Sequence, residues 1–235
     1  MMGLNLLMPQ DNDSKFYGVT IGIVTNNNDP ENLGRIKVKF PWLSEEDESP
    51  WARLLTPMAG KERGFYFLPE INDEVLVAFE QGDMAFPYIL GALWNGQDLP
   101  PEKNKDGKNN IRTIQSRSGH KITLDDTNGE EKIIIQDKTG KNQILINSQD
   151  NTINITSEKD LTIAAKGNIS FKSSDGDIAI ECQSLSIKTK AKYQLEAKSD
   201  CTIKTQAKYQ LEASTGLGIK CAKGVKINDT SVEVM

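Results

Sequence analysis

The chain has 235 residues, a length that allows one large domain or two modest ones. Its hydrophobic share of 37% lies below the roughly 45–50% of globular proteins, and most of the shortfall lies in the C-terminal half, where polar residues alternate with single Ile or Leu residues. A net charge of −5 argues against a general nucleic-acid binder, three cysteines without a CxxC pair exclude a disulfide framework, and the lack of about 18 successive apolar residues excludes an obvious transmembrane helix.

Composition divides the chain into four zones. Residues 1–15 form a short leader without a basic n-region or a small-residue cleavage site, which predicts assembly in the cytoplasm without a signal peptide. Residues 16–97 are dense in hydrophobic and aromatic residues. Residues 98–110 are rich in Pro, Lys and Asn and are predicted to be a linker. Residues 111–235 have strand-like alternation throughout.

The second zone is predicted to be a small β-barrel. Tyr17–Thr25 and Arg35–Phe40 alternate apolar and polar residues as half-buried strands do. Further strands are expected at Trp51–Leu55, Gly64–Leu68, Glu74–Phe79 and Tyr88–Leu93. About five or six short strands with Gly and Pro turns in ~80 residues are typical of an OB-fold. Trp42 and Trp51 are expected to close the ends of the barrel.

The last zone contains an internal repeat of eight residues, which begins at Asp150. Positions four and six of most octads are apolar, and in SDGDIAIE the apolar pair is shifted by one residue. The heptapeptide AKYQLEA recurs at 191–197 and 207–213. The predicted shaft core consists of the apolar pairs Ile153 and Ile155, Leu161 and Ile163, Ile169 and Phe171, Ile178 and Ile180, Leu185 and Ile187, Tyr193 and Leu195, Cys201 and Ile203, Tyr209 and Leu211, Leu217 and Ile219, and Val225 and Ile227.

An octad offers a strand of about five residues with two inward side chains, too few for the core of a single-chain solenoid. It suits one side of a triangular prism shared by three chains, in which each chain turns by a third per octad. The predicted fold is therefore all-β: an N-terminal OB-fold barrel followed by a C-terminal intertwined triple-stranded β-helix in a homotrimer. The apolar pairs within 111–149 are expected to continue the shaft upstream. The alternative to the trimeric β-helix is a monomeric β-solenoid or a segment of a fibre stalk.

Several segments resemble the spike proteins of contractile injection systems, namely phage baseplate assembly protein V and VgrG. They are DPENLGRIKVKFPW at 29–42, SPWARLLTPMAG at 49–60, GFYFLPEINDEVLVAFEQGD at 64–83, PYILGALWNG at 87–96 and SRSGHKITLDDTNGEEKIIIQDKTG at 116–140. The first four match the family's OB-fold, and the last resembles the start of its β-helix. Their order and spacing carry the resemblance.

The resemblance implies a structural central spike that docks on the hub at the tube tip and punctures the target envelope when the sheath contracts. The short leader implies that the trimeric hub is a separate polypeptide, and residues 98–110 leave no room for a lysozyme domain. Expected partners are the hub, the tail tube, other baseplate components and the target cell envelope, and the tip is open to a small PAAR-type capping protein. No specific nucleic-acid partner is expected.

No catalytic, cofactor-binding or metal-ligating residue is predicted. The single histidine, His120, is expected to be structural, with a three-copy metal site on the axis as the alternative. Asp125 and Asp126, like Asp73 and Glu74, stand at turns, where neighbouring residues point apart and do not form a glycosidase pair. The three Cys201 thiols are expected to pack as a small apolar layer.

The sequence leaves three alternatives to the spike function. An OB-fold can bind single-stranded nucleic acid through a basic groove, to which Arg35, Lys37 and Lys39 would contribute. A receptor-binding or adhesive trimeric fibre is the main alternative, and an envelope-degrading enzyme is the third. The nine lysines between Ser186 and Lys226 are interpreted as a solvated face that prevents edge-to-edge pairing, with contact to anionic membrane as a secondary interpretation.

Overall fold

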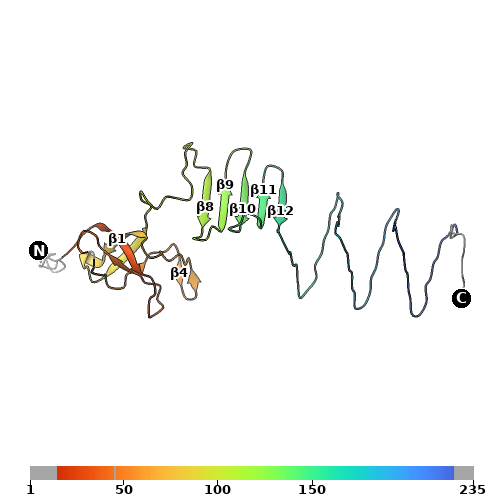
Figure 1. Cartoon of the computed structure of the whole chain (residues 1–235), viewed down its shortest axis with the longest axis horizontal. Coiled ribbons are helices and arrows are strands. Elements are labelled where there is room, and N and C mark those ends of the chain that lie inside the picture. The colour runs from red at the N-terminus through yellow and green to blue at the C-terminus, as the bar shows by residue number, and fades with distance from the viewer. Residues whose placement is uncertain (1–14, 45, 225–235) are drawn as a thin grey trace, which may run out of the picture. The chain divides into compact units, whose positions relative to one another are not determined.

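The computed structural model describes residues 15–44 and 46–224. The chain divides into two compact units, Met1–Ala164 and Ala165–Met235, and every strand of the described residues lies in the first (Figure 1). The described residues contain twelve strands and a single three-residue 3-10 helix, so the all-β class is confirmed.

The N-terminal part of the first unit is a five-stranded, OB-like sheet. Its strands, in spatial order, are β2 (Lys37–Lys39), β1 (Val19–Asn26), β6 (Glu74–Phe79), β7 (Pro87–Ala92) and β3 (Arg53–Leu54). Neighbours are antiparallel except β3 and β7, which are parallel. The short strands β4 (Ala59–Gly60) and β5 (Arg63–Gly64) form a separate hairpin, and η1 (Glu80–Gly82) connects β6 to β7.

Period-two alternation builds the core of this sheet. Along β6 every second residue is buried, namely Val75, Val77 and Phe79. The complete core comprises Val24, Ile36, Val38, Phe40, Ala52, Val75, Val77, Phe79 and Ile89. The core packs closely on Gly22 of β1, because a Cβ at this position would lie 3.1 Å from methyl groups of Val38 and Val77.

One expectation for this domain needs correction. The strand expected at Gly64–Leu68 ends at Gly64, because the hairpin partner β4 is only two residues long. Trp42 is 51% exposed and stacks on Phe16 with 5.4 Å between ring centroids. Trp51 is half-buried, and the charged groups of Arg35 and Lys37 lie 5.9 and 5.4 Å from its ring centroid. That these two tryptophans close the ends of the barrel stays a prediction.

The second sheet is a meander of five strands in which each strand pairs with the next along the chain. Its strands are β8 (Ile111–Gln115), β9 (Lys121–Asp125), β10 (Lys132–Gln136), β11 (Gln143–Asn147) and β12 (Thr152–Thr156). All four pairings are antiparallel. This corrects the expectation that 111–149 continues the octad winding, since turns such as 126–131 and 137–142 are long enough to reverse the chain onto itself.

Beyond Thr156 the described chain runs as extended segments joined by bends (Figure 1). The bends recur at 158–159, 166–167, 174–176, 183, 190–191, 198–199, 206–207, 214–215 and 222–223. They fall at the first residues of the octads, where the repeat predicts turns. Residues 157–224 form no strand within the single chain, so the predicted β-helix strands have no pairing partner there.

Candidate functional site: an exposed apolar sheet face

The meander presents one face made almost entirely of aliphatic side chains. The strand registers align them in two columns that run across the sheet. One column is Ile114, Ile122, Ile135, Ile144 and Ile155, and the other is Leu124, Ile133, Ile146 and Ile153. Because side chains alternate across a strand, none of these residues shares a face with the polar residues between them.

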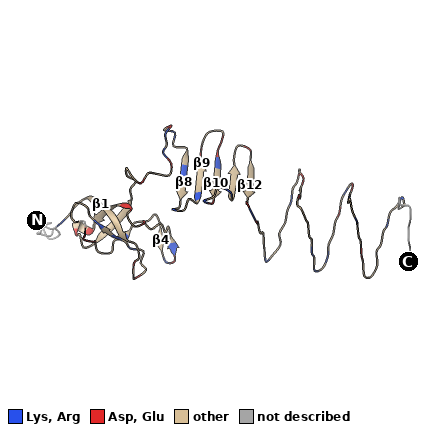
Figure 2. Ribbon diagram, in the orientation of Figure 1, with Lys and Arg blue, Asp and Glu red and all other residues tan. Residues whose placement is uncertain are grey.

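These nine side chains are exposed in the single chain, with relative accessibilities between 37% and 69%. An apolar sheet face is stable when another layer covers it. Contiguous apolar patches of this kind mark interaction surfaces. Strands β11 and β12 contain no charged residue at all, which removes the charge that would discourage association (Figure 2).

The reverse face of the meander is mainly polar and carries Lys121, Asp125 and Lys132. Arg112 is the exception among the charged strand residues, because the register places it opposite Leu124 at the edge of the aliphatic face. Lys132 lies directly opposite Asp125 in the register, with 3.3 Å between Nζ and Oδ2. Hydrogen bonds from Thr127 and the nearby Lys132 lower the pKa of Asp125. The two faces therefore differ in kind: the polar face is suited to water and the aliphatic face to protein.

The turns of the meander are closed by side-chain hydrogen bonds. The Asp137 carboxylate accepts bonds from Thr139 Oγ1 at 2.8 Å and from Asn142 Nδ2 at 3.0 Å. The bonds from Asn142 and Thr139 lower the pKa of Asp137 to about 2. The carboxylate thus fixes the turn between β10 and β11 and is committed to structure.

His120 occupies a turn position beside the aliphatic face. Its Nδ1 accepts a hydrogen bond from the backbone N–H of Lys138 at 3.2 Å, which joins the turn between β8 and β9 to the turn between β10 and β11. Within residues 15–44 and 46–224, no cluster of three or more His, Cys, Asp or Glu side chains is arranged to hold a metal ion. Asp125 and Asp126 bind Lys132 and Arg112 respectively.

The predicted shaft-core side chains are exposed in the single chain wherever the structure describes them. The large apolar members have accessibilities between 47% and 71%, and Cys201 is also exposed. The exposed members are Ile153, Ile155, Leu161, Ile163, Ile169, Phe171, Ile178, Ile180, Leu185, Ile187, Tyr193, Leu195, Cys201, Ile203, Tyr209, Leu211, Leu217 and Ile219.

Ile153 and Ile155 lie on the uncovered face of β12, and the octads after Thr156 have no neighbouring strand within the described chain. No strand forms between residues 157 and 224, so the described chain provides no second layer to cover the apolar pairs there. Val225 and Ile227 lie outside the described residues. The inward role of the twenty residues therefore stays a prediction, because it needs neighbouring chains.

Two of the three basic residues considered for a nucleic-acid groove, Arg35 and Lys37, are engaged within their own chain. Arg35 binds Asp29 through Nε at 2.9 Å and Nη2 at 2.8 Å. Lys37 binds Glu48 at 3.0 Å and lowers the pKa of that carboxyl. These contacts leave Trp51 covered by cations, which disfavours a stacking groove for single-stranded nucleic acid.

The Asp29 cluster is a structural feature that the sequence reasoning missed. Asp29 is only 6% exposed and also accepts backbone hydrogen bonds from Glu31, Leu33 and Arg35 at 3.0–3.3 Å. The bonds from Arg35 hold the pKa of Asp29 well below its usual range and raise that of Arg35. The sequence does contain a signal for this cluster, since in the segment DPENLGR an aspartate and an arginine stand at the two ends of a predicted turn.

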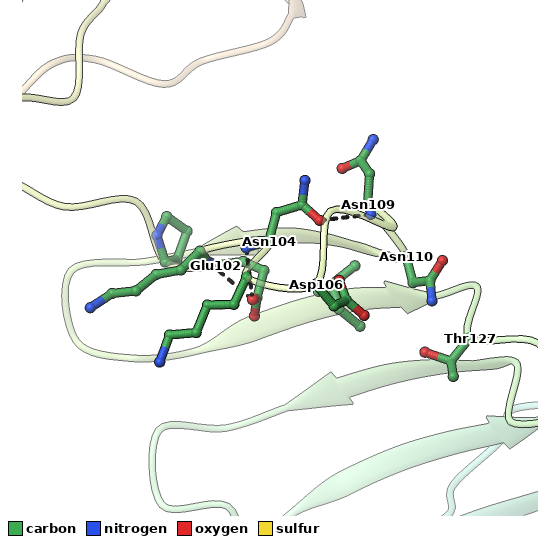
Figure 3. A pocket seen from close by; sticks show the side chains of 10 residues that line it. Glu102, Asn104, Asp106, Asn109, Asn110 and Thr127 are labelled. Carbon is green, nitrogen blue, oxygen red and sulfur yellow. Dashed lines mark hydrogen bonds between the residues drawn. The ribbon is translucent and has the colours of Figure 1, made fainter.

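The predicted linker forms a shallow hollow of about 500 Å³ beside Thr127 (Figure 3). Its polar groups satisfy one another: Glu102 accepts from the N–H of Lys103 at 2.9 Å, and Asn104 accepts from the N–H of Asn109 at 2.7 Å. The hollow is thus a consequence of loop turns.

In the described part of the chain no helix has the length and hydropathy to cross a membrane.

The OB-like sheet decides the relationship to known proteins. Residues 20–94 match the family model of the type VI secretion system/phage-baseplate injector OB domain. The matched segment runs from β1 to just past β7, which is the whole of the first sheet. The expected resemblance to VgrG-like spike proteins is confirmed.

Individual relatives agree with this match. The chain is 31% identical over 112 residues to type VI secretion system spike protein VgrG3 of Vibrio cholerae, covering 44% of this chain and 11% of that protein. It is 31% identical over 117 residues to spike protein VgrG1a of Pseudomonas aeruginosa, covering 44% and 18%. The actin cross-linking toxin VgrG1 of Vibrio cholerae is 32% identical over 108 residues, covering 43% and 10%. The chain thus spans between a tenth and a fifth of the length of these relatives.

Proposed function

We propose that this protein is the trimeric central spike of a contractile injection machine. The collar is the OB domain, which docks on a trimeric hub at the end of the tail tube. The octad region forms the shaft, which is driven through the target envelope when the sheath contracts. The role is mechanical, and the particle is assembled in the cytoplasm.

The exposed aliphatic face of β8–β12 is the observation that carries this proposal. Three copies of the meander, each turning this face toward a common axis, would bury all nine aliphatic side chains and leave the polar reverse faces in water. The octad pairs that follow would continue the same interior. Strands that pair between chains leave no lateral edge, which makes the assembly stiff.

The similarity of the OB domain to an injector domain supports the position in the machine. The alternative of an adhesive fibre would use the same shaft, but it does not account for the injector OB domain.

Native mass decides the assembly, and particle activity decides the role. We expect the purified chain to have three times the 26.1 kDa mass of one chain in native mass spectrometry and equilibrium sedimentation. Particles assembled with a chain lacking 166–221 are expected to contract normally and to lose killing or delivery. A monomer in solution, or full activity of the shortened particles, would overturn the proposal.

A further inference from the structure

The octad region carries an alternating series of charges that the apolar repeat does not require. In seven successive octads, the residue directly after the second apolar residue is charged, and its sign alternates without exception. These residues, here called the octad ladder, are Lys172, Glu181, Lys188, Glu196, Lys204, Glu212 and Lys220. All seven are exposed in the described chain.

The shifted octad SDGDIAIE shows that the charge follows the side-chain face and not the count of eight. There the apolar pair moves one residue along, to Ile178 and Ile180. Glu181 moves with it, so it still directly follows the second apolar residue. The alternation of sign therefore survives an irregularity in the repeat itself.

The ladder residues lie on the face opposite the apolar pairs. Successive side chains of an extended segment point to opposite sides, so the residue after Leu195 points away from it. A hydrogen bond of 3.5 Å from Gln194 Nε2 to Glu196 Oε2 places these two outward side chains on one face. Bends at 190–191, 198–199, 206–207 and 214–215 separate successive ladder residues, so that each belongs to its own extended segment.

No charged partner for the ladder is found within the described chain. Among residues 165–224 the structure has no ion pair, although lysines and glutamates alternate there. A solvated lysine face would account for the positive residues, but it does not account for a glutamate at every second step. Complementary charges on neighbouring surfaces account for both.

We propose that the octad ladder pairs between neighbouring copies of the chain and fixes their register at a stagger of one octad. This inference rests on the proposed trimer. If each chain turns by a third of the prism per octad and rises by one strand, the octad of one chain is stacked on the next octad of its neighbour. Stacked strands lie about 4.8 Å apart, so each ladder lysine meets a glutamate above and below.

The register needs such a device because the apolar pairs discriminate poorly. Most octads supply similar aliphatic or aromatic pairs, and AKYQLEA occurs twice. Repetitive strands of this kind are prone to slippage. Like charges directly opposite each other on neighbouring strands are destabilising. If neighbouring chains were stacked with no stagger, or with a stagger of two octads, each ladder lysine would face a lysine and each ladder glutamate a glutamate.

The first test exchanges charges without changing the net charge. The double variant Lys204→Glu/Glu212→Lys puts like charges at two ladder steps, beside Glu196 and beside Lys220. The matched control Asp175→Lys/Lys190→Glu exchanges charges at exposed bend positions. We expect a lower thermal midpoint of the trimer for the ladder variant and little change for the control. Inverting Glu181, Lys188, Glu196, Lys204, Glu212 and Lys220 together keeps the net charge, restores alternation among these six steps and is expected to recover most of the midpoint.

The second test measures the register directly by cross-linking in a chain whose three native cysteines are replaced by alanine. A disulfide needs Cα atoms usually about 4.4–6.8 Å apart. Glu196→Cys/Lys204→Cys is expected to give a covalent trimer on a denaturing gel after oxidation. Glu196→Cys/Glu212→Cys, two steps apart at roughly twice the strand spacing, is expected to give none.

The outcomes separate the ladder from the trimer. A trimer in which the ladder variant melts like its control, or in which only the two-step cysteine pair cross-links, would overturn the ladder and leave the spike proposal standing. If both the cysteine-free chain and the unmodified chain are monomers in native mass spectrometry, the trimer and the ladder are overturned together.

Discussion

At the scale of single residues, Asp29 shows how one side chain can close a long turn. Its carboxylate receives three backbone N–H groups and the Arg35 guanidinium within a loop that has no secondary structure of its own. The loop leads directly into β2, so its closure positions the strand that carries Val38 into the core. This carboxylate therefore stabilises the fold of the loop.

Asp29→Asn is expected to lower the thermal midpoint of the OB domain by several degrees, because the amide cannot accept all these bonds as a charged group does. Glu31→Gln, which removes only one exposed partner of Arg35, is the matched control and is expected to have little effect. Calorimetry of both variants at pH 7 checks this. Equal midpoints for Asp29→Asn and the unmodified chain would contradict it.

Acid is expected to remove the contribution of the Asp29 carboxylate to the stability of the OB domain. Because the folded pKa of this carboxyl is depressed below its ordinary value of 3.8, its contribution is full above about pH 4 and is lost as pH falls through the lower, folded value. The difference in midpoint between Asp29→Asn and the unmodified protein is therefore expected to be constant from pH 7 to about 5 and to shrink toward pH 2. Thermal scans across this range measure it, and a difference that grows with acidity would have the wrong sign.

The core of the OB domain allows a calibrated change at Ile36, which is fully buried. Ile36→Ala is expected to cost about 2–5 kcal/mol of unfolding free energy and Ile36→Val about 0.5–1.5 kcal/mol, because the lost contacts leave a cavity. Urea unfolding of both variants gives the two values. Ile21→Ala on the exposed face of β1 is the control, and a larger loss there would mean that the buried face has been misassigned.

At the scale of elements, the meander separates two functions by face. Ile133 and Ile134 are neighbours on β10, yet Ile133 stands in the aliphatic columns and Ile134 on the polar reverse face between Thr123 and Leu145. A strand therefore offers a matched pair of apolar residues that differ only in the face they occupy.

Ile133→Lys is expected to prevent assembly of the trimer, because it places an unpaired charge in the proposed interior. Ile134→Lys introduces the same residue one position away and is expected to leave assembly intact. Sedimentation equilibrium of both variants distinguishes them. Trimers of equal stability for both variants would show that the aliphatic columns are not the interface.

At the scale of the whole molecule, the octad ladder makes the number of octads matter as well as the total length. Removing 190–197 brings Lys188 next to Lys204, whereas removing 190–205 brings Lys188 next to Glu212. The longer deletion is therefore expected to give the more stable trimer, although it loses twice as many residues. Thermal midpoints of the two deletions decide this, and the opposite order would favour simple loss of shaft length.

Local pattern was sufficient for much of this protein. Alternation and turn residues predicted most strands of the OB domain, β6 to the residue, because its core alternates with period two. The octad spacing of the bends was also predicted, since each octad contains its own turn. The aliphatic pairs of β9, β10 and β11 were recognised for the same reason. The burial expected for octad residues such as Ile163, Phe171 and Ile203 could not be tested in the same way, because it depends on strands that the single chain does not supply.

What the sequence by itself determined is the all-β class, the OB-like collar, the octad period and the alternating charges, all of which are set by residues close together in the chain. The tertiary structure decided that 111–156 folds back on itself as an antiparallel meander, that Trp51 lies under cations, and that Asp29 holds its loop. These features depend on turn geometry and on which side chains meet once the strands have paired.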